Sequence, residues 1–293
     1  MIQPVKNLPA NNTLTVRSRI CGGLGNQLFQ YAAGRALSLR LRCPFELDLT
    51  FYDRRRHRQF ELDRFSISAD WNLTNGNRLS PQKLFRALSR SRDQTPIYKE
   101  QSKTFDPQFN LLTAPIELDG YFFSDKYFAD QSDTIRTELQ PPAATDADSV
   151  RILSRIQEQE STALHIRRGD YVTNKKASDR FCSCTLDYYE QAMEQIGGNG
   201  TVFVFSDDIQ WAKQNLRQVK PLEFVDADPN QDGIRDMWLM TCAHHHIIAN
   251  SSFSWWGAWL AGAEQGVTIA PAKWFNDSAI DDSDMVPESW IRI

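Results

Sequence analysis

Residues 163–171, with the sequence ALHIRRGDY, decide the fold prediction. The first four are mostly apolar and indicate a buried strand, which stops at two arginines, a glycine and an acid. The same order continues along the chain. Further strands are expected at 202–205, 222–225, 246–249 and 267–270, and helices at 149–159, 186–196, 209–216, 233–243 and 254–263. Such alternation predicts a parallel sheet with helices on both faces.

The first part of the chain predicts a similar unit. Residues 14–20 alternate apolar and polar side chains like a half-buried strand, and they run into the glycine-rich stretch GGLGNQ at 22–27. A helix and a strand at 45–49 follow, with helices at 80–91 and 124–139 and a strand at 116–120. Pro141 and Pro142 cannot continue a helix and mark a linker. We therefore expect two Rossmann-like domains, 1–143 and 144–293, whose parallel sheets face a central cleft.

Composition narrows the classes of function. The 293 residues carry a net charge of −4 with acids and bases mixed, which argues against a nucleic-acid-binding protein. The basic run at 54–58 is interpreted as a solvated loop. No stretch reaches the roughly 20 apolar residues of a transmembrane helix, and the first residues lack a signal peptide's apolar core. We expect the protein in the cytoplasm, either free or bound peripherally at the inner membrane surface.

Polar residues at the carboxyl ends of parallel strands are the candidate site, because doubly wound sheets bind ligands there. Arg167 and Arg168 offer forked donors that suit a diphosphate, although a surface Arg–Asp pair would give the same pattern. Asp207 and Asp208 end the next strand, where they could equally be helix N-caps. Ser251 and Ser252 precede a helix whose free N–H groups form an anion site, and capping is their alternative role.

Other patterns carry less information. The stretch 22–27 resembles a loose phosphate loop, but a tight turn that needs positive φ explains its glycines equally well. Acids spaced as DxD, a metal-binding pattern, occur at 146–148 in the expected linker and at 226–228 after a strand. The histidines at 244–246 straddle a helix end and a strand, so their side chains should diverge, with only the first two exposed. The five cysteines form no zinc pattern.

Several segments, taken in order, resemble the alpha-1,2-fucosyltransferases of glycosyltransferase family 11. The first is GGLGNQLFQYA at 22–32, and the third is HIRRGDY at 165–171. The last runs from Asn250 to Ala261. Between them lie LDGYF at 118–122 with KYF at 126–128, FSDD at 205–208 and DMWLM at 236–240. The similarity extends from about residue 17 to 275.

The resemblance implies a two-domain GT-B fold whose C-terminal half holds a GDP-sugar. By the same resemblance Arg167 grips the donor's diphosphate, His165 lies against the nucleotide, and Arg168 and Asp170 support the loop. In related transferases an acid sixteen residues before a phosphate-contacting serine reads guanine, and that position before Ser252 is Asp236. The remaining expected donor-binding residues are Asp207, Asp208, Asn250, Ser251, Ser252 and Phe253.

The reaction implied is transfer of L-fucose from GDP-beta-L-fucose to a hydroxyl of a galactose-terminated glycan, with inversion and an alpha-1,2 linkage. Arg167, Asn26 and Asp170 are the expected catalytic residues, and Gly23, Gly25, Asn26 and Gln27 form the expected acceptor-side loop. No metal or cofactor is expected. Fucose transfer to another hydroxyl or to a protein, and a non-catalytic GDP-sugar-binding module, remain alternatives. The general base stays unassigned.

Overall fold

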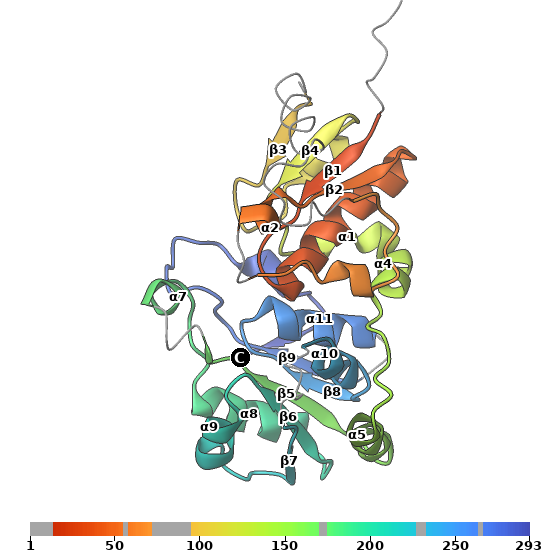
Figure 1. The fold of residues 1–293 in the computed structure, drawn as a ribbon. Helices are drawn as coiled ribbons and strands as arrows, with labels where there is room; N and C mark the ends of the chain where they lie inside the picture. Colours follow the sequence, from red (N-terminus) through yellow and green to blue (C-terminus); the bar gives the residue numbers. More distant parts are fainter. Residues whose placement is uncertain (1–13, 55–57, 72–94, 170–174, 227–232, 263–265) are drawn as a thin grey trace, which may run out of the picture.

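The computed structural model describes residues 14–54, 58–71, 95–169, 175–226, 233–262 and 266–293. It consists of two α/β units, each built on a parallel sheet and placed one above the other in Figure 1. The sequence predicted this architecture. The helix expected at 80–91 lies outside the described residues.

The N-terminal sheet has four strands in the order β2-β1-β4-β3, and every neighbouring pair is parallel. Its strands are β1 (Val16–Arg19), β2 (Phe45–Asp48), β3 (Ile97–Lys99) and β4 (Ile116–Asp119). Val16 lies opposite both Phe45 and Ile116, so β1 is central. The glycine-rich turn after β1 leads into α1 (Leu24–Leu41), and it therefore emerges at the middle of the sheet's carboxyl edge.

The C-terminal sheet has six parallel strands in the order β10-β9-β8-β5-β6-β7. They are β5 (Thr162–Ile166), β6 (Val202–Ser206), β7 (Leu222–Phe224), β8 (His245–Ile247), β9 (Thr268–Ala270) and β10 (Ile291–Arg292). The chain builds outward from β5 through β6 to β7, and then returns to the other side of β5 with β8. Strand order thus reverses between β5 and β8, which is where open α/β sheets bind ligands.

Helices connect these strands much as the sequence predicted. Beyond α1 they are α2 (Thr50–Arg54), α4 (Ser132–Leu139), α5 (Ala147–Gln157), α7 (Lys175–Arg180), α8 (Leu186–Ile196), α9 (Ile209–Asn215), α10 (Gly233–Thr241) and α11 (Ser252–Ala261). The helix expected at 124–139 is wrong in its first half, which forms the short 3-10 turns Asp125–Tyr127 and Ala129–Gln131. These turns direct the side chains of Tyr127 and Phe128 into the core, where both are buried.

The two units share one hydrophobic core through α1 and α11, which lie against each other in Figure 1. The ring of Phe29 on α1 lies 4.5 Å from that of Trp255 and 5.0 Å from that of Trp256. Phe128 stacks on Trp256 at 5.6 Å, and the Arg136 guanidinium covers Trp259 at 3.8 Å. The tryptophans of α11 therefore join the two units.

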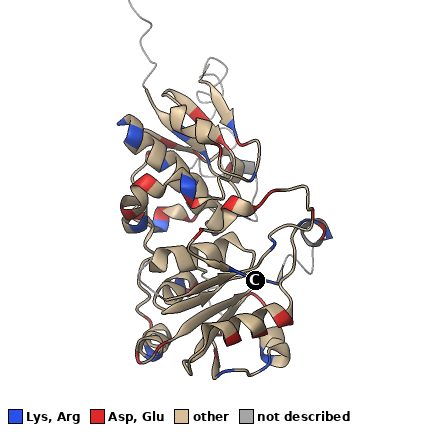
Figure 2. Ribbon diagram, turned by 180° about the vertical axis from the view of Figure 1, so that it is seen from behind, with Lys and Arg blue, Asp and Glu red and all other residues tan. Residues whose placement is uncertain are grey.

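Charged residues are distributed over both units. In Figure 2 the positions of Lys and Arg and those of Asp and Glu are interspersed along the ribbon of both units, in agreement with the mixed composition. Within the described ranges, no helix combines the length and the apolar character that crossing a membrane requires.

Candidate functional site

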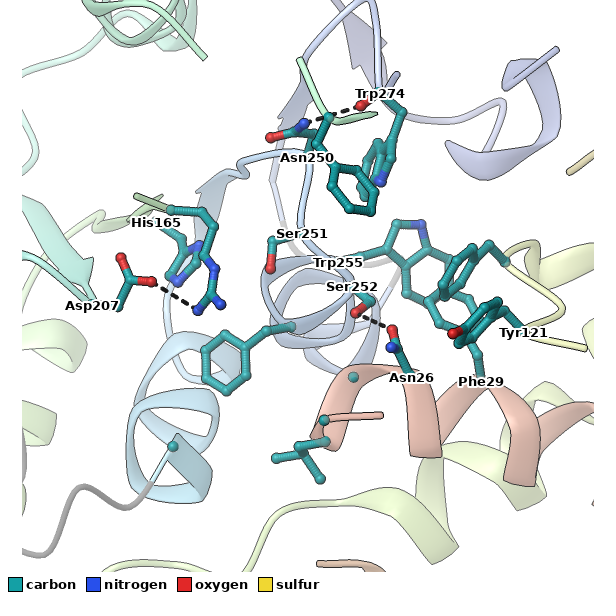
Figure 3. A pocket seen from close by; sticks show the side chains of 18 of the residues that line it. Asn26, Phe29, Tyr121, His165, Asp207, Asn250, Ser251, Ser252, Trp255 and Trp274 are labelled. Carbon is teal, nitrogen blue, oxygen red and sulfur yellow. Dashed lines mark hydrogen bonds and ion pairs between the residues drawn. The ribbon is translucent and has the colours of Figure 1, made fainter. Parts of the chain in front are cut away.

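A cavity of about 790 Å³ lies between the two units at the carboxyl ends of both sheets. Its N-terminal wall is formed by Gly23, Leu24, Gly25, Asn26, Phe29, Arg58, Glu61, Tyr121 and Phe123. The C-terminal unit supplies the rest: His165, Arg167, Arg180, Phe181, Ser206, Asp207, Ile209, Gly233, Asp236, Asn250, Ser251, Ser252, Phe253, Trp255, Trp274 and Met285. In Figure 3 the cavity extends from His165 and Asp207, past Ser251, to Tyr121 and Phe29.

Arg167 is held at the end of β5 by an acid from the next strand. Its Nη1 lies 2.8 Å from Oδ2 of Asp207, whose Oδ1 accepts the Arg168 N–H at 2.9 Å. Gly169 permits this approach, because a Cβ at that position would lie 2.5 Å from Asp207 Oδ2. The guanidinium is about one quarter exposed and lines the cavity. A fixed, forked cation in this position suits an anionic oxygen group.

His165 contributes a neutral ring beside this cation. Burial lowers its pKa to about 4, and the charge of Arg167 acts in the same direction while Asp207 opposes it. The ring packs 5.4 Å from that of Phe253. Its buried Nδ1 has no hydrogen-bond partner among the described residues, although the residue lines the cavity. An unpaired buried polar atom is costly, so a ligand group at this point would be stabilised.

Arg168 and Asp208 lie beside the cavity and are not part of its lining. The Arg168 guanidinium stacks on Trp211 at 3.7 Å, and its Nε lies 3.3 Å from Asp208 Oδ2. Asp208 is the N-cap of α9, where its Oδ1 accepts the Trp211 N–H at 3.2 Å. The capping interpretation is therefore confirmed for Asp208. Asp170 lies outside the described residues.

Two helices begin at the cavity, one from each unit. Gly23 precedes α1, and Ser251 precedes α11 without a side-chain capping bond. Ser252 Oγ donates to Asn26 Oδ1 at 2.9 Å, which joins the two helix starts (Figure 3). Both helix dipoles therefore place their positive ends at the cavity, where an anion would be stabilised.

The glycines of the loop have separate physical causes. Gly22 has φ +85°, which confirms the tight-turn interpretation at that position. Gly25 is required by close packing, because an added Cβ would lie 2.5 Å from the carbonyl carbon of Ser252 and 2.6 Å from the nitrogen of Phe253. The loop thus serves as a contact surface for α11 as well as a turn.

Asp236 lies in the first turn of α10 and lines the cavity. The preceding residue, Arg235, is buried and holds this turn in place through Ser149 Oγ at 2.8 Å, the Asp226 carbonyl at 3.0 Å and Asp148 Oδ2 at 3.0 Å. The ring of Phe253 packs against the start of α10, since a Cβ at Gly233 would lie 3.2 Å from it. A carboxylate beside an aromatic face can bind the N–H edge of a flat base.

The side chain of Asn250 holds other parts of the cavity wall. Its Nδ2 donates to the carbonyls of Cys182 and Trp274, the latter at 3.1 Å. Gln27 is also a supporting residue, because it is fully buried and does not line the cavity. Both were predicted to lie at the site. Asn250 lines the cavity and also supports its wall, whereas Gln27 lies behind the lining.

Sequence reasoning missed several lining residues. Arg58 belongs to the basic run interpreted as a solvated loop, yet it is exposed into the cavity beside Gly23. Glu61, Arg180, Trp274 and Met285 come from segments without regular periodicity. Their one sequence signal was weak, because isolated charged or aromatic residues in loops do not distinguish a cavity lining from an ordinary surface.

The metal-like patterns have structural explanations. Asp146 caps α5 by accepting the Ser149 N–H at 2.9 Å, and Asp226 pairs with Lys213 at 2.6 Å outside the cavity lining. Asp228 lies outside the described residues.

The histidine run differs from the prediction of diverging side chains. Glu160, His244 and His245 bring potential ligand atoms within 4.8 Å of one another, and His245 is buried. Because Val267 N–H donates to His245 Nδ1 at 2.8 Å, Nε2 carries the hydrogen that Glu160 accepts at 2.9 Å. Metal binding through Nε2 would require loss of that hydrogen. The arrangement therefore fits a hydrogen bond between His245 and Glu160 better than a metal site.

Comparisons with known proteins agree with this arrangement. The alpha-1,2-colitosyltransferase of Escherichia coli is 34% identical over 95% of this chain and 98% of its own length. The O-antigen biosynthesis glycosyltransferase WbnK of Escherichia coli is 31% identical over 94% of this chain and 99% of its own. Among solved structures, FUT1 of Arabidopsis thaliana in complex with GDP has a TM-score of 0.52 at 10% identity, covering 97% of this chain and 77% of that one.

The last similarity concerns the fold, which is GT-B-like with two parallel sheets. The model of glycosyl transferase family 11 matches residues 97–293, which include the whole C-terminal wall of the cavity. The chain therefore belongs to glycosyl transferase family 11.

Proposed function

We propose that this protein transfers L-fucose from GDP-beta-L-fucose to a hydroxyl of an acceptor glycan, with O2 of a terminal galactose as the expected position. Residues 144–293 would bind the donor, and residues 1–143 would supply much of the acceptor site. The product would carry an alpha-1,2 linkage, since single displacement inverts the beta-linked donor.

The observation that carries the proposal is the convergence of three anion-binding features on one cavity. They are the Arg167 guanidinium fixed by Asp207 and the starts of α1 and α11. A diphosphate beside these groups would place a base toward Asp236 and Phe253. Its sugar would then point toward the aromatic side chains of Trp255, Tyr121 and Phe123, whose apolar faces suit carbohydrate rings.

The chemistry follows from where charge develops. As the bond between sugar C1 and the β-phosphate oxygen breaks, negative charge grows on the departing GDP. Arg167 and the first-turn N–H groups of α11 would stabilise that charge without reorganising, which lowers the barrier. Asn26 would orient an acceptor hydroxyl through its amide, because its Oδ1 already accepts from Ser252.

A second donor has specific support. The first relative described above is an alpha-1,2-colitosyltransferase that matches nearly the whole chain. GDP-colitose is therefore the donor to compare directly with GDP-fucose. Fucose transfer at another position or to a protein, and donor binding without catalysis, are the remaining alternatives.

The deciding experiment measures GDP release and glycan product with each donor. The acceptors are lactose, N-acetyllactosamine and a galactosyl-beta-1,3 disaccharide, with product linkage determined by NMR. GDP-fucose turnover and an alpha-1,2 product support the proposal. Preference for GDP-colitose would change the donor assignment, and tight GDP binding without turnover on any acceptor would favour the binding-module alternative.

Asp236→Ala should weaken GDP binding by about 1–3 kcal/mol, because the base would lose a buried hydrogen-bond acceptor. Isothermal calorimetry with GDP and with ADP measures the effect, and the difference between the two nucleotides should shrink in the variant. Asp226→Ala is the matched control, since that acid pairs with Lys213 outside the cavity lining. Unchanged GDP affinity in Asp236→Ala would remove Asp236 from base recognition.

We further propose that transfer needs no metal ion, because arginine and helix starts supply the positive charge. Activity should persist at full rate in excess EDTA after dialysis. A loss of transfer that Mn²⁺ or Mg²⁺ restores would contradict this and return attention to the acids at 226 and 228.

A further inference from the structure

The N-terminal wall of the cavity contains a carboxylate that no motif indicated. Glu61 is the one acidic residue that the N-terminal unit contributes to the lining, within the described part of the chain. It is partly buried and lies between the exposed Arg58 and the fully buried Leu62. This wall is the one to which the function proposed above assigns much of the acceptor site.

The main chain at Glu61 is fixed to the glycine loop by a buried side chain. Gln27 is fully buried, and its Oε1 accepts the Glu61 N–H at 2.9 Å. Its Nε2 donates to the carbonyl of Gln59 at 2.9 Å and to that of Gly22 at 3.3 Å. The position of Glu61 is thereby tied to the first turn of α1, where Asn26 and Gly23 also line the cavity.

A tyrosine also contacts the glycine loop. The Tyr52 hydroxyl donates to the Gly22 carbonyl at 3.1 Å. Burial raises the pKa of this phenol, the charge of Glu61 adds to the rise, and Arg58 opposes it. Arg58 lies beside the same loop, since a Cβ at Gly23 would lie 3.3 Å from its Nη1.

The other carboxylates that line the cavity belong to the C-terminal unit. Asp207 uses one oxygen for Arg167 at 2.8 Å and the other for the Arg168 N–H at 2.9 Å. Asp236 belongs to the C-terminal wall, next to Arg235 at 3.5 Å. A proton acceptor for an incoming hydroxyl is needed on the opposite wall, and Glu61 is the carboxylate in that place.

We propose that Glu61 is the general base of the transfer, an inference that rests on the function proposed above. The acceptor O–H bond breaks and its proton moves to the Glu61 carboxylate. The oxygen's electron pair forms the bond to sugar C1, while the bond from C1 to the β-phosphate oxygen breaks and its pair leaves with GDP. Gln27 then acts as a positioning residue, because it holds the main chain of the base.

Glu61→Gln tests this role, because it keeps the size of the side chain and the main-chain bond to Gln27 while removing the base. We expect kcat for glycan transfer to fall at least about a hundredfold, as is typical when a general base is lost. The KM for GDP-fucose should stay within about twofold. The acid limb of the kcat–pH profile should vanish, and Glu61→Asp should restore part of both. Asp63→Asn, an exposed acid on the same segment, is the control and should retain full activity.

Retention of more than a tenth of wild-type kcat by Glu61→Gln would overturn the assignment. A parallel loss of GDP-fucose binding would do the same, since it indicates a structural role. If Glu61→Gln fails to fold, the pH profile of Glu61→Asp decides, because an unmoved acid limb contradicts a base at this position. Wild-type protein that transfers no sugar with any donor would instead refute the proposed function itself.

Discussion

Arg167→Lys should lower kcat by at least about a hundredfold, while GDP binding weakens much less. The substitution keeps the positive charge but removes the planar fork that can bind two diphosphate oxygens at once. Asp207 holds the guanidinium in one orientation at 2.8 Å, and a flexible ammonium would not reproduce that geometry. Because charge on the leaving GDP grows between the bound donor and the transition state, the loss should fall on the chemical step. Single-turnover kinetics and calorimetry with GDP separate the two effects.

Arg168→Lys is the matched control. Arg168 stacks on Trp211 and pairs with Asp208 beside the cavity, so its replacement should cost far less in kcat. A folded Arg167→Lys protein with more than half of wild-type turnover would contradict the role given to this arginine. Equal losses of kcat in both variants would mean that the loop after β5 responds as a whole, without a special role for Arg167.

Gly25→Ala should have the second largest effect. The new Cβ would lie 2.5 Å from the Ser252 carbonyl carbon and 2.6 Å from the Phe253 nitrogen, and main-chain atoms cannot rotate away. The start of α11 must then move away from α1. Overpacking of this kind typically costs about 1–3 kcal/mol of stability. A shift of about 1 Å at a catalytic site can lower the rate about a hundredfold. Chemical denaturation and kcat measure the two consequences.

Gly23→Ala provides the comparison, since it also lines the cavity. Its φ of −87° suits any residue, and the added Cβ would meet only the mobile end of Arg58 at 3.3 Å. We expect near-normal stability and only a modest loss of turnover. If both variants behave alike, the contact between α1 and α11 does not control the site.

The fold was predictable where strands are buried on both faces. The central strands β5 and β6 are short, mostly apolar and buried runs followed by polar residues, so the apolar pattern and the expected site at the strand ends agreed. The strands β3 and β10 were missed, because both are short edge strands without a buried residue. The first half of the helix expected at 124–139 was wrong because burial of Tyr127 and Phe128 outweighed local helix propensity.

The candidate site was predictable on one wall and largely hidden on the other. Arg167, Asp207 and Ser252 follow predicted strands directly, so chain order places them at one edge of the sheet. Glu61 and Trp274 reach the cavity through long-range contacts, with Gln27 and Asn250 respectively. Such contacts depend on the packing of distant segments, which a single sequence does not record.

The aromatic core shared by α1 and α11 also determines the order in which the protein can complete its folding. During synthesis the N-terminal unit emerges first, with Phe29 and Phe128 ready to pack but without their tryptophan partners. Those partners arrive only when α11 has left the ribosome. Until then an apolar face stays open to solvent or to a chaperone. The packing of the first unit is therefore complete only when the second is in place, and the site between them needs both.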